Sequence, residues 1–285
     1  MKLITWNIQW GRGIDRRVDL ERIVATARAI ADFDVLCVQE LGDNFPGLEG
    51  SEGADQFSEL AELLLPEYRL FAAFGVDVAG DGGRRRRFGN AILTRYSVLS
   101  IRRHALPWPA DPGKETMPRV AVEATLQAPM GAIRVTTTHL EYYSDLQRRA
   151  QAARLRHLHD EACQRVARPG AQTAEGGPFD ATPQTTAAIL TGDFNFPPDH
   201  PAYEEIQHAL PGGGPAYRDA WAIARRREPH TPTFCVHEKG YSREAYCCDF
   251  VFVSADLAPR IHAIDVDSET KASDHQPVLL ELDDR

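Results

Sequence analysis

Apolar and polar residues alternate along this chain with two periods, which predicts strands and helices in mixed order. Strand-like apolar runs occupy residues 2–8, 34–39, 68–78, 89–106, 119–126, 132–138, 187–190, 247–254, 260–267 and 276–282. Helical spacing occupies residues 15–31, 56–65, 144–166 and 203–210, with Asp15 expected to cap the first helix and Pro66 to end the second. Hairpin-like strand pairs mixed with helical crossovers predict an α/β fold of two packed sheets with helices outside.

The length of 285 residues fits a single α/β domain spanning 1–285, and no repeat of fixed period divides it. The formal net charge of −9 argues against a protein that coats nucleic acid, because such affinity comes mostly from neutralised phosphates. Five cysteines without Cys-x-x-Cys spacing are interpreted as reduced core thiols. Met1 leads into an apolar strand without a signal peptide, and no run is long enough to span a membrane, so a cytoplasmic protein is expected.

The stretch Gly192-Asp193-Phe194-Asn195 follows the apolar run 187–190 and precedes two prolines. Period-two geometry turns Asp193 and Asn195 to the same side of a strand. Two oxygen-bearing side chains there suit a hard cation or a water that attacks phosphorus. An Asx-rich exit from a strand into a turn explains the same residues, so this stretch alone leaves both interpretations open.

Polar residues recur where the predicted strands end. Any one of them is typical of a turn or a helix cap, but eight in one chain indicate a common site: Asn7, Glu40, His139, Asp193, Asn195, Asp249, Asp274 and His275. Acids, amides and imidazoles without a cysteine cluster fit Mg²⁺ or Mn²⁺ better than structural zinc.

The ordered motifs resemble the endonuclease/exonuclease/phosphatase superfamily, which includes pancreatic deoxyribonuclease, inositol-polyphosphate phosphatases and neutral sphingomyelinases. The matching stretches are Trp6-Asn7-Ile8, Gln39-Glu40, Thr138-His139-Leu140, Gly192-Asp193-Phe194-Asn195, Asp249-Phe250-Val251-Phe252 and Ser273-Asp274-His275. They cover essentially the whole chain in the family's order. The resemblance implies a four-layer α/β sandwich, with two packed mixed sheets flanked by helices and the site at one end of both sheets.

The resemblance also implies roles for the residues that hold the metal. Glu40 would be the principal ligand of Mg²⁺ or Mn²⁺, with Asn7 beside it. Asp274 would help to hold the ion or its water.

The remaining residues would act on the phosphate and the attacking water. Asp193 would align or deprotonate the water, and Asn195 would hold a phosphate oxygen. Asp249 would orient His275, so that the imidazolium stabilises charge on phosphorus, and His139 would face the phosphate or the leaving oxygen. Phosphoryl transfer needs mainly positioning and stabilisation of negative charge, which this division of labour supplies. Abasic-site endonucleases usually carry tyrosine at the His139 position, which disfavours that branch.

Three weaker features have two interpretations each. Arg119 either contacts a phosphate or forms a salt bridge at a sheet edge, and Asn90 either approaches the substrate or belongs to a turn. Arg84-Arg85-Arg86-Arg87 forms either a solvated loop or a contact for a polyanion. The loops at 42–54, 79–88, 107–117 and 168–186 show no pattern that identifies a ligand.

The sequence therefore predicts a metal-dependent phosphoesterase that cleaves a phosphodiester, or a phosphomonoester, by single-step attack of water. The alternatives are a nuclease of the same superfamily, with nucleic acid as its partner, and a non-catalytic binding module on this fold. The sequence leaves the leaving group and the oligomeric state open.

Overall fold

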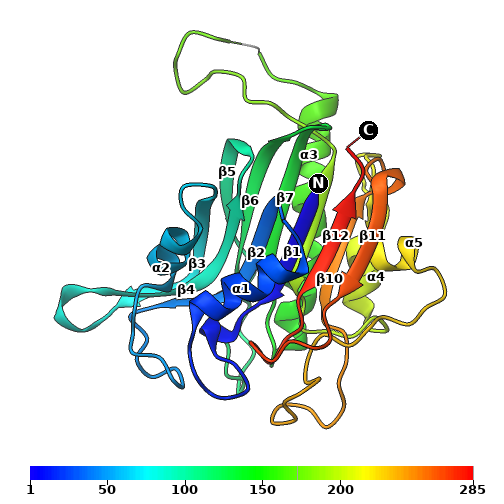
Figure 1. The fold of residues 1–285 in the computed structure, drawn as a ribbon. Coiled ribbons are helices and arrows are strands. Elements are labelled where there is room, and N and C mark those ends of the chain that lie inside the picture. Colours follow the sequence, from blue (N-terminus) through cyan, green and yellow to red (C-terminus); the bar gives the residue numbers. More distant parts are fainter. Residues whose placement is uncertain (172, 285) are drawn as a thin grey trace.

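Twelve strands form two six-stranded sheets in the computed structural model, which describes residues 1–171 and 173–284 (Figure 1). The first sheet has the order β11 (Ile261–Val266), β12 (Val278–Leu282), β1 (Lys2–Asn7), β2 (Val35–Asp43), β4 (Arg85–Thr94), β3 (Arg69–Ala79). The second has the order β5 (Ser97–Ala105), β6 (Val120–Ala128), β7 (Gly131–His139), β8 (Ala188–Asp193), β10 (Asp249–Ser254), β9 (Tyr217–Asp219). Each sheet is mixed, because β1 pairs with β2 and β7 pairs with β8 in parallel, whereas the other pairs are antiparallel.

Helices cover the outer face of each sheet. Alternate residues along a strand face opposite sides, so Leu3 of β1 lies in the core between the sheets while Ile4 packs towards α1 (Leu20–Ile30) and α2 (Gln56–Leu64). On the other side, α3 (Asp145–Ala167) and α4 (Pro201–Gln207) pack against β8 and β10, and α5 (Ala220–Ala224) follows β9. The predicted four-layer sandwich is therefore confirmed. One hydrophobic core lies between the two sheets, and the single domain stays a prediction.

The two parallel pairs determine where the site lies. Parallel strands need a crossover, and α1 joins β1 to β2 as α3 joins β7 to β8. The carboxyl ends of all four strands consequently meet at one end of the sandwich. Gln39 of β2 ties the sheets together there, since its Nε2 donates to Thr137 Oγ1 of β7 at 2.8 Å.

Several predicted boundaries were wrong. The first helix begins at Leu20, because Asp19 rather than Asp15 accepts the backbone N–H of Arg22. The run 89–106 is two strands in different sheets, since β4 ends at Thr94 and β5 starts after a short turn. Arg85–Arg87 belong to β4, so the predicted arginine loop is mostly strand.

Two further differences concern the second half of the chain. The helix predicted at 203–210 is α4, which begins at Pro201 where the His200 ring accepts the N–H of Ala202. The pattern gave no indication of β9 and α5. The predicted loop 168–186 is free of helix and strand in its described part, and residue 172 lies outside the described residues. No described helix is long and apolar enough to cross a membrane.

Candidate active site

The strand ends bring polar side chains from both sheets together. Gly192, with φ 137°, lies so close to β7 that a Cβ there would approach the Thr138 carbonyl oxygen to 1.9 Å. Only glycine therefore permits the β7–β8 pairing that sets Asp193 opposite His139. Asn7 crosses the gap between the sheets, because its Nδ2 donates to Glu40 Oε1 and to Asp193 Oδ2, both at 3.0 Å.

Left-handed backbone occurs repeatedly at this end of the sheets. Gln9, Glu40 and Asn195 have φ values of 46°, 63° and 53°. Glu40 lies where the β2–β4 register shifts, between Val38 and Leu41. Such conformations cost of order 1–3 kcal/mol each and persist only where the surroundings enforce them. Asn195 therefore reaches the site through a turn after β8, and not through the strand alternation expected from the sequence.

Asp193 lies at the centre of the cluster. Its Oδ2 is 3.4 Å from His139 Nε2 and 3.6 Å from His275 Nε2. Burial raises the pKa of its carboxyl group to about 6, even though the charge of His275 and the Asn7 hydrogen bond oppose that rise. A carboxylate with this pKa can accept a proton near neutral pH.

Asp249 and His275 form the predicted pair. His275 Nδ1 is 2.8 Å from Asp249 Oδ2, and Thr233 donates its hydroxyl to the same oxygen at 2.6 Å. Burial alone would lower the pKa of His275, but the Asp249 and Asp193 carboxylates outweigh it and raise that pKa well above the ordinary value. The imidazole is therefore a cation at neutral pH.

His139 behaves in the opposite way. Burial and the nearby Arg119 charge lower the pKa of His139 well below its ordinary value, so the ring is neutral. Asn195 Nδ2 lies 2.9 Å from both the Leu140 carbonyl oxygen and His139 Nε2. The carbonyl identifies Nδ2 as the donor, so His139 Nε2 accepts and Nδ1 carries the proton, 3.7 Å from Glu40 Oε1. Both N–H groups of Asn195 are thus engaged, and holding a phosphate oxygen would require one of these bonds to break.

Buried carboxyl groups supply a donor set for a hard cation. Burial raises the pKa of Glu40. Burial, together with the nearby Glu40 charge, raises the pKa of Asp274 to about 6. Gln9 orients Asp274 by donating from Nε2 to Oδ2 at 2.7 Å. Oxygen ligands with uncompensated negative charge fit Mg²⁺ or Mn²⁺, which would neutralise them.

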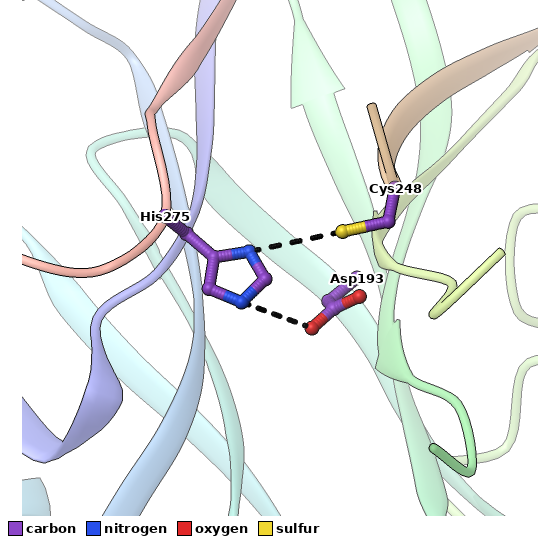
Figure 2. A group of neighbouring side chains, drawn as sticks. All are labelled: Asp193, Cys248 and His275. Atoms are coloured by element: carbon purple, nitrogen blue, oxygen red, sulfur yellow. Dashed lines mark hydrogen bonds and ion pairs between the residues drawn. The ribbon is translucent and has the colours of Figure 1, made fainter. Parts of the chain in front are cut away.

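A cysteine lies within the cluster, which the sequence did not indicate. Asp193, Cys248 and His275 each offer one ligand atom, and these atoms lie within 4.8 Å of one another (Figure 2). Burial raises the pKa of the Cys248 thiol well above its ordinary value, and the thiol donates to Asp249 Oδ2 at 3.5 Å. Cys248 is therefore a protonated neighbour of the pair. All five cysteines are free and buried, as predicted.

The two weaker candidates lie at the edge of the site. Arg119 forms a buried salt bridge through Nε to Glu141 Oε2 at 3.2 Å, while its Nη1 has no hydrogen-bond partner within residues 1–171 and 173–284. Arg119 lines the cleft beside His139. Asn90 donates to the Val120 carbonyl at 2.9 Å and lines only a small side cavity, so its contact with substrate stays a prediction.

A cleft of about 380 Å³ opens over the cluster. Asn7 and Asp249 lie beneath its surface, whereas the other predicted metal and catalytic residues line it. Sequence reasoning missed Gln9, which lies in a short 3-10 turn just after β1, and Thr233 and Phe234, which lie in a loop. The proximity of Gln9 to Asn7 was the one available signal.

Replacing Asp249 with asparagine is expected to lower kcat by about 10²-fold with little change in KM, since the His275 charge matters most in the transition state. Loss of the carboxylate also lowers the pKa of His275, so the decline of activity at alkaline pH should move to lower pH. Steady-state pH profiles measure both effects. Asp256→Asn, on an exposed residue just after β10, is the matched control. A rise in KM alone would show that Asp249 is structural.

The fold and the site define a class: an α/β sandwich of the phosphoester-hydrolase type, with acids and imidazoles at the ends of both sheets. The chain belongs to the endonuclease/exonuclease/phosphatase family, whose model matches residues 4–275. Members of this family are generally metal-dependent hydrolases of phosphoesters. No curated protein matches the sequence.

Solved structures share the fold at low identity. An endonuclease/exonuclease/phosphatase from Beutenbergia cavernae has a TM-score of 0.64 and 22% identity, over 98% of this chain and 70% of that one. A mannosyl-6-phosphatase from Bacteroides thetaiotaomicron has a TM-score of 0.66 and 20% identity, over 99% of both chains. A 3′ phosphatase from Neisseria, bound to a product DNA hairpin, has a TM-score of 0.59 and 18% identity, over 99% of both chains.

Proposed function

We propose that this protein is a metal-dependent phosphoesterase that hydrolyses a phosphodiester, or a phosphomonoester, by in-line attack of an activated water. The observation that carries the proposal is the position of Asp193 between two imidazoles of opposite protonation state. A base beside a fixed cation is the pairing that phosphoryl transfer requires.

The residues divide the work in the following way. Asp193 orients the water and takes its proton. His275, held by Asp249, stabilises the charge that builds on the phosphoryl oxygens. Asn195 fixes the tautomer of His139, so that this ring presents its Nδ1–H towards Glu40 and the cleft.

Glu40, Asn7 and Asp274 are the residues proposed to hold Mg²⁺ or Mn²⁺. The bound cation would supply Lewis-acid stabilisation of the phosphoryl oxygens. The raised pKa values of Glu40 and Asp274 support this assignment, because a nearby cation relieves the cost of ionising buried carboxyl groups. We also propose a cytoplasmic location, which the free buried cysteines support and cell fractionation tests.

A panel of phosphoesters tests the proposed function. The purified protein with Mg²⁺ or Mn²⁺ should release p-nitrophenol from bis(p-nitrophenyl) phosphate or from p-nitrophenyl phosphate, and excess chelator should abolish the release. Hydrolysis that continues unchanged in chelator would contradict the metal mechanism. Failure on every ester, by a protein that stays folded, would favour the binding-module alternative.

The nuclease alternative depends on the arginines of the β3–β4 hairpin. Each is paired: Arg84 and Arg87 with Asp43, Arg85 with Asp77, and Arg86 with Asp81. Because Asp43 is buried, Arg84 and Arg87 are needed to compensate its charge, and a clean test replaces only the other two.

The Arg85→Ser/Arg86→Ser double variant is therefore added to the panel, with a DNA oligonucleotide as a further substrate. We expect less than a twofold change in kcat/KM on both the oligonucleotide and the aryl diester. A selective loss on the oligonucleotide, together with a weaker salt dependence, would instead establish the nuclease.

A further inference from the structure

The cleft has two chemically different parts. Its polar part contains the strand-end residues described above together with Arg119 and the aromatic side chains of Tyr142, Tyr143, Phe234 and Tyr241. Its other part, here called the apolar wall, is formed by half-buried side chains from the loop after β2, the β3–β4 hairpin and the segment before β6: Phe45, Leu48, Val76, Phe88 and Met117. The hairpin projects from the first sheet (cyan in Figure 1), and its Val76 and Phe88 side chains line the cleft.

Packing fixes the apolar wall in place. Val76 and Phe88 are cross-strand partners just beyond a register shift in the hairpin. Gly75 lies so close to the segment before β6 that a Cβ would approach the Pro118 carbonyl oxygen to 2.3 Å, which brings Met117 beside the hairpin. Phe45 meets Phe88 edge to face, with ring centroids 6.3 Å apart. The wall is a preformed surface.

The apolar wall carries no side-chain hydrogen-bonding group for a sugar hydroxyl or the edge of a nucleobase. Trp10 is adjacent, but its indole N–H already donates to the Glu49 carbonyl at 2.9 Å. A polar ligand group placed here would lose its hydrogen bonds to water without replacement, which costs free energy. An apolar group would instead gain from burial.

Charge limits the number of phosphates. The described cations that line the cleft are Arg119 and His275, and they face the carboxyl groups of Glu40, Asp193 and Asp274. The hairpin arginines are occupied by aspartates. Beyond Nη1 of Arg119, a second phosphate would therefore find no unpaired guanidinium in the described part of the cleft.

We propose that the substrate is a phosphoester with a single phosphate and an apolar ester group, which lies against the apolar wall. This inference rests on the proposed function, because the phosphate is assigned to the polar part of the cleft. An alkyl chain and an unsubstituted aromatic ring share the required chemistry, and the experiment distinguishes them.

The kinetic test compares methyl, butyl, hexyl and phenyl esters of p-nitrophenyl phosphate, which share one leaving group. We expect kcat/KM to rise about fourfold for each methylene that reaches the wall. In the Val76→Ser/Phe88→Ser variant the ratio of hexyl to methyl kcat/KM should fall at least tenfold. Val78→Ser is the matched control, since Val78 lies on the same strand, is exposed and does not line the cleft.

A binding test separates this inference from the proposed function. Calorimetry measures the Kd of methyl, hexyl and phenyl phosphate for the intact protein in the presence of Mg²⁺. Tighter binding of hexyl than of methyl phosphate, by tenfold or more, supports the apolar wall whether or not an ester is hydrolysed. A lack of hydrolysis would contradict only the proposed function. A stronger effect of phenyl than of hexyl identifies an aromatic ring as the occupant. Equal Kd values for all three ligands would overturn the inference, whether or not hydrolysis occurs.

Discussion

The Asp193→Asn variant is expected to lose about 10³-fold or more of kcat while becoming more stable than the wild type. The loss follows from removing the group proposed to take the proton from water, a contribution of typically 10²–10⁴-fold. The gain in stability follows from the pKa of Asp193, which is raised to about 6 in the folded protein. A variant that loses activity but gains stability would show that Asp193 is retained for function and not for the fold.

The sign of the stability effect can be worked out from proton binding. A carboxyl group with a raised folded-state pKa binds its proton more tightly in the folded than in the unfolded chain. The carboxyl group therefore makes its full contribution to the free energy of unfolding below its ordinary pKa. This contribution is lost as pH rises through about 6. At pH 7.5 the ionised carboxylate therefore destabilises the folded chain, and asparagine removes this cost.

Thermal unfolding in chelator measures that difference. The variant should unfold several degrees above the wild type at pH 7.5, and the two should coincide near pH 4. Asp199→Asn, on an exposed residue of the following loop, is the matched control and should change neither activity nor unfolding temperature. A variant that is inactive and also less stable at pH 7.5 would show that Asp193 is structural.

The Glu40→Gln variant is expected to lower kcat/KM by about 10²–10³-fold, which corresponds to about 3–4 kcal/mol of transition-state stabilisation. Glutamine keeps the shape and can still accept the Asn7 N–H bond, so the fold should persist. Because a neutral carboxamide is a poorer ligand than a carboxylate, calorimetry should show weaker binding of Mg²⁺ or Mn²⁺. Circular dichroism checks the fold.

Glu62→Gln on the exposed face of α2 provides the matched control and should retain wild-type metal affinity and turnover. Unchanged metal affinity in Glu40→Gln would assign the ion to other residues. Lost affinity with full activity would contradict a catalytic role for the ion.

The sequence by itself determined the layers of the fold and most of the site. Alternating apolar residues such as Leu3 and Ile4 must face opposite sides of a strand, which requires two cores and hence covering helices. Asn7 and Asp193 end the strands β1 and β8, so their placement depends only on local pattern, whereas Glu40 lies at a register shift within β2 and His275 lies in the segment before β12. Local pattern did not give the starts of α1 after Asp19 and of α4 at Pro201, because a cap depends on which side chain reaches the free N–H groups.

Only the tertiary structure decided how these groups interact and what surrounds them. The opposite protonation states of His139 and His275 arise from burial and from neighbours that are distant in sequence. Thr233 reaches the site through a loop and Gln9 through a 3-10 turn, and no periodicity encodes either path. The apolar wall exists because a hairpin and two loops converge, and convergence of distant segments is a property of packing that single-sequence patterns do not contain.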